Sequence, residues 1–412
     1  MLVDVSHPIR VCRACRRPDL TLVLSLGDQF VSDFPRDAGA LVHKVPLDVV
    51  RCGSCGLVQL RHTVSRDLIY KHDYWYKSSA SSTMVKALAD IVDKALALVQ
   101  LRRNDLVLDI GSNDGSLLRL YPTNLMLHKV GFEPSRVVEE SSDVGTIVQD
   151  YFSRSAYEER FGATKAKIIT SVSMFYDLED PETFVQNVRD CLSMDGVWVI
   201  QQNYLGTMLE QNGYDNICHE HLAYHSLRSM KSLLDRNSLE VFKTEINDVN
   251  GGSFRTYVAH KGQREVDPSV SKMELYEKRM KLNDPVTYRK FSESILEQRN
   301  KTREFIETVV KKGEEVYVYG ASTRGNTILQ YCGLDHRLIK AATDNNPAKW
   351  GRHTVGTDIP IIPHDKAIKE KPDYFLVLPV HFLREILALE RGYLESGGKF
   401  IVPLPQFRIV TA

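Results

Sequence analysis

The order of apolar and polar positions divides the chain into four stretches. Residues 1–72 carry short apolar runs, as in strands, separated by turn-forming residues. Residues 73–267 open with an amphipathic helical pattern over 81–100 and continue with apolar strand patterns that alternate with helical ones. Residues 268–312 are charged and helical, and residues 313–412 return to the alternation of strand and helix. We therefore predict a small N-terminal domain, two α/β domains and a helical connector between those two.

Both α/β domains are predicted to hold doubly wound sheets. Apolar strands such as "LVLDI" and "GVWVIQQN" in the first domain, and "EEVYVYG" and "PDYFLVLP" in the second, alternate with amphipathic helices. Open sheets of this kind bind their ligands at the carboxyl ends of the strands. We therefore look for chemistry in the segments that directly follow these strands.

Length and charge narrow the class of protein. With 412 residues the chain favours two or three domains. Lys plus Arg and Asp plus Glu both total 53, so no overall charge favours a nucleic acid or an anionic membrane as partner. No apolar run is long enough to cross a bilayer, and the first residues lack the apolar core of a signal peptide. These features predict a cytoplasmic protein that binds neither nucleic acid nor membrane.

The N-terminal stretch contains four of the seven cysteines, as two C-x-x-C pairs. The first C-x-x-C motif contains Cys12 and Cys15, and the second contains Cys52 and Cys55. Each pair places two thiolates on one tetrahedral ion, and two pairs complete a structural zinc site without an open coordination position. The alternative is four ordinary buried cysteines. Because this stretch has little apolar material for a core of its own, we predict a zinc ion that cross-links it.

A strand, a glycine-containing turn and a helix start follow one another in "VLDIGSNDGSLLR". Gly111 and Gly115 let the backbone approach a ligand at the end of the strand. Glu133 ends the next strand, where a carboxylate accepts hydrogen bonds from ribose hydroxyls. Asp109 is suited to meeting an ammonium group, and Asn113 belongs to the same turn. These residues predict a binding site for S-adenosylmethionine (SAM).

A second strand, turn and helix start occur in "VYVYGASTRGNT", with Gly320 and Gly325 in the turn. Two interpretations remain open. The turn can hold phosphate oxygens at the helix N-terminus with Arg324 beside them, or its glycines can serve only the packing of strand against helix.

The window "DNICHEHLAYHS" gathers ionisable side chains after the strand "GVWVIQQN". Cys218, His219, Glu220 and His221 are consecutive. A metal site is one interpretation, but the spacing does not match a helical pair of ligands. A histidine beside a carboxylate is suited to removing a proton, so we predict an acid/base loop near the SAM site.

The motifs follow one another in a recognisable order: C-x-x-C, C-x-x-C, "YWYKSS", "LDIGSNDG", "GFEP", "CHEHLAYHS" and "YGASTRGNT". Over nearly its full length the chain resembles the SAM-dependent sugar C-methyltransferases, which act on nucleotide-linked 4-keto-deoxysugars. The resemblance implies a small zinc-binding N-terminal domain and a Rossmann-like SAM-binding middle domain. It also implies a Rossmann-like C-terminal domain that helps to hold the nucleotide sugar.

The resemblance also assigns roles to single residues. It implies that His221 is the general base, with Glu220 as its neighbour in the active site. His219 and Tyr76 are candidates for stabilising the enolate oxygen, and Tyr76 is expected to contact the substrate, although aromatic residues in "YWYKSS" also suit packing at a domain junction. The expected contacts to the nucleotide are Gly320, Ser322, Arg324, Asn326 and Lys349.

Two departures from the family are visible. Cys218 stands immediately before His219, where related enzymes carry a tyrosine, so a phenol that could donate a hydrogen bond is missing there. The segment "SVSMFYDLEDP" at 171–181 lacks the histidine of the better-known sugar enzymes. Both departures indicate a divergent subgroup.

The predicted function is SAM-dependent methylation at C3 of a nucleotide-linked 4-keto-deoxysugar, as a monomer or dimer. Methylation of another carbonyl-activated acceptor is one alternative. A second is an NAD(P)-dependent sugar ketoreductase, although no Tyr-x-x-x-Lys lies near the glycine turn. A third is a zinc-containing nucleic-acid adaptor, against which the zero net charge argues.

Overall fold

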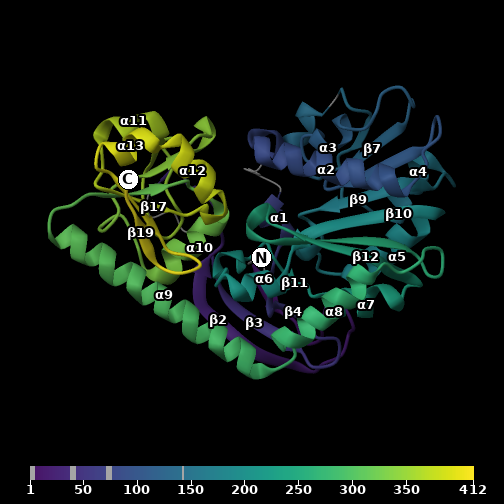
Figure 1. Ribbon diagram of the computed structural model, residues 1–412, viewed down its shortest axis with the longest axis horizontal. Coiled ribbons are helices and arrows are strands. Elements are labelled where there is room, and N and C mark those ends of the chain that lie inside the picture. The colour runs from purple at the N-terminus through teal and green to yellow at the C-terminus, as the bar shows by residue number, and fades with distance from the viewer. Residues whose placement is uncertain (1–4, 38–42, 71–76, 142) are drawn as a thin grey trace.

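The structure is a computed structural model that describes residues 5–37, 43–70, 77–141 and 143–412. Figure 1 shows three bodies, with the N-terminal strands in purple between a middle domain on the right and a C-terminal domain on the left. The predicted α/β fold class, with a small N-terminal domain and two Rossmann-like domains, is confirmed.

The middle domain is built on one largely parallel sheet. Within the described residues its strand order is β8-β7-β6-β9-β10-β13-β12, parallel from β8 to β10, with β13 antiparallel to β10 and β12. The strands are β6 (Leu106–Ile110), β7 (His128–Phe132), β8 (Thr146–Val148), β9 (Ala166–Val172), β10 (Leu192–Asn203), β12 (Leu239–Asn247) and β13 (Ser253–His260). Every residue of β6 is buried, as is typical of a central parallel strand. The order reverses between β6 and β9, and their carboxyl ends are therefore the expected ligand site.

Helices cover both faces of this sheet (Figure 1). They are α2 (Ser82–Leu98), α3 (Ser116–Arg119), α4 (Arg154–Phe161), α5 (Pro181–Cys191), α6 (Leu205–Glu210), α7 (Leu227–Asp235) and α8 (Pro268–Met280). The helical pattern predicted over 81–100 is confirmed by α2. Its N-terminus is capped by Ser81, whose hydroxyl accepts a hydrogen bond from the Met84 amide at 3.3 Å. Its apolar face packs on the sheet beside Val107 and Val199.

The C-terminal domain repeats this design. Its strand order is β16-β15-β14-β17-β18-β19, with β19 antiparallel to β18 and the others parallel. The elements are β14 (Val316–Tyr319), α10 (Thr323–Cys332), β15 (Ala342–Asp344), β16 (Ile361–Pro363), α11 (His364–Glu370), β17 (Tyr374–Val377), α12 (Leu383–Leu389), α13 (Arg391–Glu395), β18 (Lys399–Val402) and β19 (Arg408–Val410). The glycine turn after β14 therefore lies at the ligand-binding edge of this sheet.

The N-terminal sheet takes one of its strands from the middle of the chain. Its order is β11-β4-β3-β2, and β1 pairs separately with β5. The elements are β1 (Ser6–Pro8), β2 (Leu20–Phe30), β3 (Lys44–Cys52), β4 (Val58–Leu60), β5 (His62–Val64), α1 (Arg66–Tyr70) and β11 (Ala223–Tyr224). Because β11 directly follows the histidine cluster, the N-terminal sheet holds one end of that loop.

One long helix joins the parts. Helix α9 (Pro285–Lys311) has 27 residues and spans about 40 Å. It buries Tyr288, Ile295 and Ile306 in a core that also contains residues of the N-terminal sheet and of the C-terminal domain. The predicted connector 268–312 thus consists of helices α8 and α9. Helix α8 packs against β12 and α7. The exact division into four domains stays a prediction.

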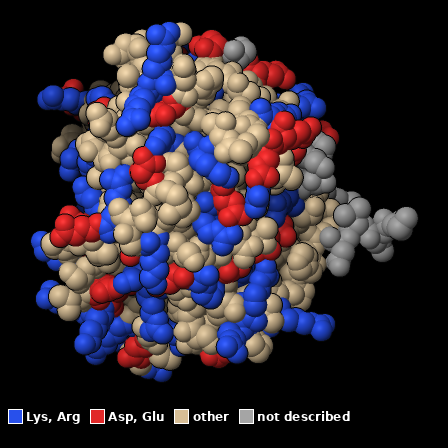
Figure 2. All heavy atoms as spheres, turned by 90° about the vertical axis from the view of Figure 1, so that its right-hand side faces the viewer, with Lys and Arg blue, Asp and Glu red and all other residues tan. Residues whose placement is uncertain are grey.

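Short 3-10 turns fill several connections: η1 (Ser78–Ala80), η2 (Arg136–Glu140), η3 (Phe175–Asp177), η4 (Tyr214–Asn216), η5 (Val249–Gly251), η6 (Pro347–Lys349) and η7 (Val380–Phe382). On the face in Figure 2, which is the right-hand side of Figure 1, Lys and Arg side chains are interspersed with Asp and Glu side chains. Among the described helices, none is both long and apolar enough to cross a membrane.

Candidate active site

A cavity of about 390 Å³ opens at the carboxyl ends of β6, β7 and β9. Its polar wall includes Asp109, Asn113 and Glu133, and its apolar wall includes Phe132 and Met174. Ligand pockets commonly combine apolar walls with a few placed polar groups in this way. The predicted SAM residues therefore gather around one space, with Gly111 in the same lining.

The glycine turn gives this cavity its shape. Gly111 has a φ of +78°, which favours glycine, and a Cβ there would lie 3.0 Å from the Met174 side chain. Gly115, with a φ of +76°, is the N-cap of α3. The turn also orients Glu133. Its Oε2 accepts a hydrogen bond from the backbone N–H of Asn113, and its Oε1 accepts one from the backbone N–H of Ser135, both at 2.9 Å. Each carboxylate oxygen keeps a lone pair for a ligand hydroxyl.

Asp109 lines the same cavity but has a protein partner. It accepts a hydrogen bond from the Thr170 hydroxyl at 2.6 Å. Burial raises the pKa of Asp109 to about 7, and the negative charge of Glu133 acts in the same direction. A ligand cation beside Asp109 would stabilise the ionised carboxylate, as the sequence prediction requires.

The residues present fit SAM. Glu133 is held for a ribose, Asp109 is suited to an ammonium, and the apolar wall is suited to an adenine ring. Two hydroxyls next to these groups, those of Ser112 and Ser135, are buried without a hydrogen-bond partner in the part of the chain that the structure describes. Such unsatisfied hydroxyls are free to bind a polar ligand.

A second cavity, of about 460 Å³, lies where all three domains meet. Phe34 comes from the N-terminal domain, Glu220 and His221 from the middle domain, and Ser322 and Arg324 from the C-terminal domain. We call it the acceptor cavity. Ser173, directly after β9, lines both cavities, so the two spaces adjoin there.

All three domains fasten the histidine loop. Strand β11 pairs with β4, and the Leu60 amide donates to the Leu222 carbonyl at 2.9 Å. The Asn203 amide group donates to Asn216 Oδ1 at 2.6 Å from the end of β10. Thr327 of α10 donates to the Ile217 carbonyl at 3.2 Å. The loop is therefore held in one position at the edge of the acceptor cavity.

His221 has the properties of a base. Its Nδ1 lies 2.9 Å from the Asn216 carbonyl oxygen, which can only accept, so Nδ1 carries the proton and Nε2 a lone pair. Burial and, second, the positive charge of Arg324 lower the pKa of His221 to about 3. The imidazole is thus neutral near pH 7. The Tyr176 ring contacts it edge-on, with the ring centroids 4.5 Å apart.

Glu220 and Cys218 flank this base. Burial raises the pKa of Glu220 to about 7, so the carboxyl group can hold or release a proton near neutrality. Burial also raises the pKa of Cys218 well above its ordinary value, which keeps the thiol neutral. The sulfur of Cys218, a carboxylate oxygen of Glu220 and a ring nitrogen of His221 lie within 4.8 Å of one another.

Two predicted catalytic residues, His219 and Tyr76, are not among the described residues of the acceptor cavity. His219 is buried and points into the N-terminal sheet, where its Nε2 contacts the Val45 carbonyl at 2.9 Å. Burial lowers its pKa to about 4. It does not line the described acceptor cavity. Tyr76 lies outside the described residues. The catalytic roles of both stay predictions.

The predicted nucleotide contacts divide into two groups. Ser322 and Arg324 line the acceptor cavity. Gly320, with a φ of +84°, shapes the turn before α10. Asn326 donates to the Ser32 hydroxyl at 2.9 Å. Lys349 is buried, with its Nζ 2.9 Å from Asp344 Oδ2 and 2.7 Å from the Ala321 carbonyl.

Arg324 is also a bridge between domains. Its Nε and Nη2 contact Asp215 Oδ2 at 2.9 and 2.5 Å, and its Nη1 donates to the Asn250 carbonyl at 3.1 Å. The guanidinium thus ties α10 of the C-terminal domain to η4 and η5 of the middle domain.

Several cavity residues were not predicted from the sequence: Ser173, Tyr176, Asn203, Asn250, Arg352 and His381. Ser173 and Tyr176 follow β9, Asn203 ends β10, and His381 follows β17. A signal for these four residues was present, since each lies at or shortly after the carboxyl end of a predicted parallel strand. Asn250 and Arg352 carried no such signal. Burial lowers the pKa of His381 to about 3, so this imidazole is also neutral.

The four N-terminal cysteines form a compact cluster. Cys12 Sγ lies 3.6 Å from Cys55 Sγ, and Cys15 Sγ lies 3.5 Å from Cys52 Sγ. All four sulfurs lie within 4.8 Å of one another. Sulfurs that share one tetrahedral zinc at about 2.3 Å are about 3.8 Å apart, so the cluster fits zinc. The Gln59 amide group donates to Cys12 Sγ at 3.2 Å and orients it.

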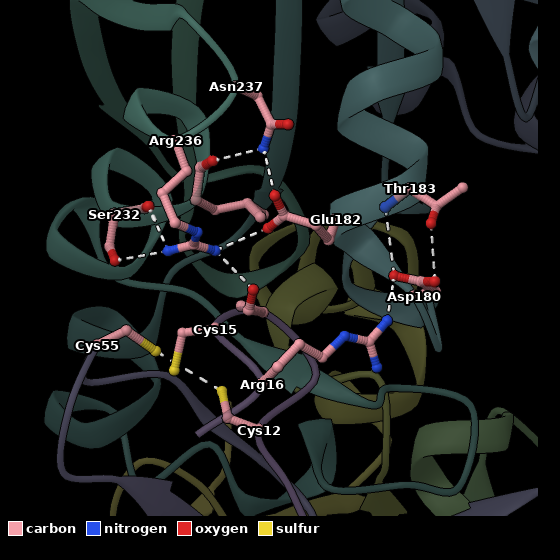
Figure 3. Close-up of polar contacts among 12 residues, drawn as sticks. Cys12, Cys15, Arg16, Cys55, Asp180, Glu182, Thr183, Ser232, Arg236 and Asn237 are labelled. Carbon is pink, nitrogen blue, oxygen red and sulfur yellow. Dashed lines mark hydrogen bonds and ion pairs between the residues drawn. The ribbon is translucent and has the colours of Figure 1, made fainter.

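The cysteine cluster is docked onto the middle domain (Figure 3). Arg16 reaches Asp180, the N-cap of α5, at 2.6 Å. From the other side, Arg236 at the end of α7 contacts the Ala14 carbonyl at 2.5 Å and Glu182 at 2.8 Å. Asp180 also lines the first cavity, which we call the cofactor cavity. The cysteine cluster therefore supports helix α5 at the border of the cofactor cavity.

A doubly wound sheet with a SAM-binding turn, joined to an acceptor cavity with a neutral histidine, defines a SAM-dependent methyltransferase. Three family models match the chain in sequence. They are described as "Putative zinc binding domain" for residues 12–70, "Methyltransferase domain" for 81–244 and "C-methyltransferase C-terminal domain" for 248–405.

The C-methyltransferase NovU of Streptomyces niveus is 32% identical over 418 aligned positions, which cover 99% of each chain. The chain belongs to the family of SAM-dependent sugar C-methyltransferases with a zinc-binding N-terminal domain. Membership of this family supports methyl transfer rather than the two alternatives, a ketoreductase and a nucleic-acid adaptor. SAM and structural zinc are its cofactors.

Solved structures of other methyltransferases share part of the fold. The mitomycin 7-O-methyltransferase MmcR is 15% identical, covers 44% of this chain and 55% of its own, and has a TM-score of 0.35. The magnesium protoporphyrin IX methyltransferase ChlM of Synechocystis PCC 6803 with bound SAM is 12% identical, covers 46% and 87%, and has a TM-score of 0.33. Likeness at this level carries no inference about the acceptor.

Proposed function

We propose that the protein methylates C3 of a nucleotide-linked 4-keto-deoxysugar, with His221 as the general base. One observation carries the proposal: the neutral base His221 lines a cavity that adjoins the cofactor cavity at Ser173. A base and a methyl donor on either side of one carbon are what C-methylation beside a ketone requires.

In the proposed reaction, His221 Nε2 takes the proton from C3, and the electron pair moves toward the C4 oxygen to give an enolate. The Asn216 carbonyl accepts a hydrogen bond from Nδ1–H throughout and stabilises the imidazolium that forms. When bound, SAM supplies the electrophilic methyl group that C3 takes up. The proton on His221 can then pass to Glu220 or to solvent.

The wall from the C-terminal domain is suited to the nucleotide. We propose that Ser322 and Arg324 contact it directly, with Arg352 adding positive charge at the same wall. Gly320, Asn326 and Lys349 do not line the described acceptor cavity, so they are proposed to hold the turn and its surroundings in shape.

The first test incubates the protein with SAM and a panel of nucleotide-linked 4-keto-deoxysugars, with mass spectrometry as the readout. We expect one methyl increment on at least one sugar, and none with His221→Asn, which still binds SAM. If no 4-keto sugar gains a methyl group, the acceptor belongs to another carbonyl-activated class. If His221→Asn keeps full activity, another residue is the base.

A further inference from the structure

Removal of a proton beside a carbonyl places negative charge on its oxygen, so the site needs a hydrogen-bond donor at that oxygen. The sequence offered His219 and Tyr76 for this task. His219 is occupied with the Val45 carbonyl, and Tyr76 lies outside the described residues. Among the described residues of the acceptor cavity, another phenol is available.

Tyr176 lies at the point where the two cavities meet. It belongs to η3, directly after β9, and lines the acceptor cavity. Its ring contacts His221 at a centroid distance of 4.5 Å and an interplanar angle of 63°. Ser173, three residues earlier in the same segment, lines both cavities. The methylated carbon must lie near this junction, and its carbonyl group is one bond away.

The phenol of Tyr176 keeps its proton. Burial raises the pKa of Tyr176 well above its ordinary value, so the hydroxyl group stays protonated near neutral pH and can donate a hydrogen bond.

Ser173 also bears a backbone cost at this point. Its φ is +54°, a region that residues other than glycine rarely adopt. Strain of this kind persists where the surrounding structure enforces it, and it gathers at functional sites. Here it occurs at the residue that lines both cavities.

We propose that Tyr176 is a catalytic residue whose phenol donates a hydrogen bond to the carbonyl oxygen of the acceptor as that oxygen becomes an enolate. The inference rests on the proposed function, since only a carbonyl acceptor needs this donor. His221 and Tyr176 then act on neighbouring atoms of one substrate: the first on the C–H bond, the second on the oxygen.

The test compares Tyr176→Phe with Tyr224→Phe. Tyr224 is a matched control: its buried hydroxyl has no hydrogen-bond partner among the described residues, and it does not line the described acceptor cavity. With a 4-keto sugar that the wild type methylates, we expect kcat to fall about 100-fold or more in Tyr176→Phe, as for loss of one oxyanion donor. The SAM affinity, measured by calorimetry, stays at the wild-type value, and Tyr224→Phe keeps the wild-type kcat.

Each other result is decisive. If Tyr176→Phe is as fast as Tyr224→Phe on an accepted sugar, the role of Tyr176 is overturned while the proposed function stands. If both variants slow and both lose SAM affinity, the phenol of Tyr176 is only structural. If the wild type methylates no 4-keto sugar, the proposed function fails and the role of Tyr176 fails with it.

Discussion

The charge state of one imidazole governs the proposed chemistry. A free histidine titrates near pH 6.5, so about a quarter of it is protonated at pH 7 and cannot act as a base. Burial and the charge of Arg324 lower the pKa of His221 to about 3. The base is therefore fully deprotonated in the free enzyme at neutral pH, and it becomes a cation only when it takes the substrate proton.

This shift predicts an unusual pH profile. Because the lowered pKa keeps His221 neutral down to pH values far below 6.5, kcat/KM of a Glu220→Gln variant, which lacks the neighbouring carboxyl group with a pKa of about 7, is expected to stay flat from pH 7.5 to about pH 5.5. Initial rates with saturating SAM measure this, with SAM affinity determined at each pH as control. An acid limb centred near pH 6.5 without loss of SAM binding would contradict the account of His221.

The spacing of the residues predicts the histidine cluster, but only the resemblance to the family distinguishes His221 from His219. His219 and His221 are one residue apart and equal in chemistry. The fold separates them, because the Val45 carbonyl of β3 binds one and the Asn216 carbonyl orients the other. Tyr176 and His381 were missed because aromatic and histidine residues after a strand are more often packing groups.

At the scale of elements, strands and helices with strong patterns were predictable, whereas β11 was not. The "LVLDI" strand and the helix over 81–100 carry their periodicity in their own residues. Strand β11 has only two residues and exists because β4, far away in sequence, pairs with it. No local sequence pattern predicts such a short strand. Strand β11 nevertheless fixes one end of the histidine loop.

The contact between α10 and η4 predicts a large effect for one substitution. Arg324→Gln leaves the Asp215 carboxylate buried without its partner, because that side chain is only 2% exposed. We expect the free energy of unfolding in urea to fall by about 3 kcal/mol or more.

Arg337 provides a matched control. It contacts Asp335 at the same two distances, 2.9 and 2.5 Å, but its side chain is 79% exposed. Arg337→Gln is expected to leave the free energy of unfolding nearly unchanged, because water replaces the lost partner. Equal losses in the two variants would contradict a bridging role for Arg324.

At the scale of the whole molecule, the N-terminal sheet connects the cysteine cluster to the histidine loop. The cysteine cluster closes the hairpin of β3 and β4, β4 pairs with β11, and β11 follows the histidine loop. The sequence predicted the four ligands from their spacing alone. It could not predict this chain of contacts, because the pairing of β4 with β11 is not local.

Loss of a zinc ligand is therefore expected to reach the active site. Cys52→Ser should lower the zinc content, measured by mass spectrometry of the metal, from one ion per chain to nearly none. The melting temperature and the methyl-transfer rate should fall with it. Cys332→Ser, at a buried cysteine outside the cluster, should keep its zinc. Full activity of a zinc-free Cys52→Ser protein would contradict the proposed linkage.

The central claim is that His221 removes the C3 proton of a 4-keto sugar. The most direct measurement follows deuterium uptake at C3 of an accepted nucleotide 4-keto sugar in deuterated water, by NMR, with the wild type and His221→Asn. The account predicts enzyme-catalysed exchange at C3 with the wild type and only the background rate with His221→Asn. Equal exchange in the two proteins, or methylation without any involvement of C3, would contradict it.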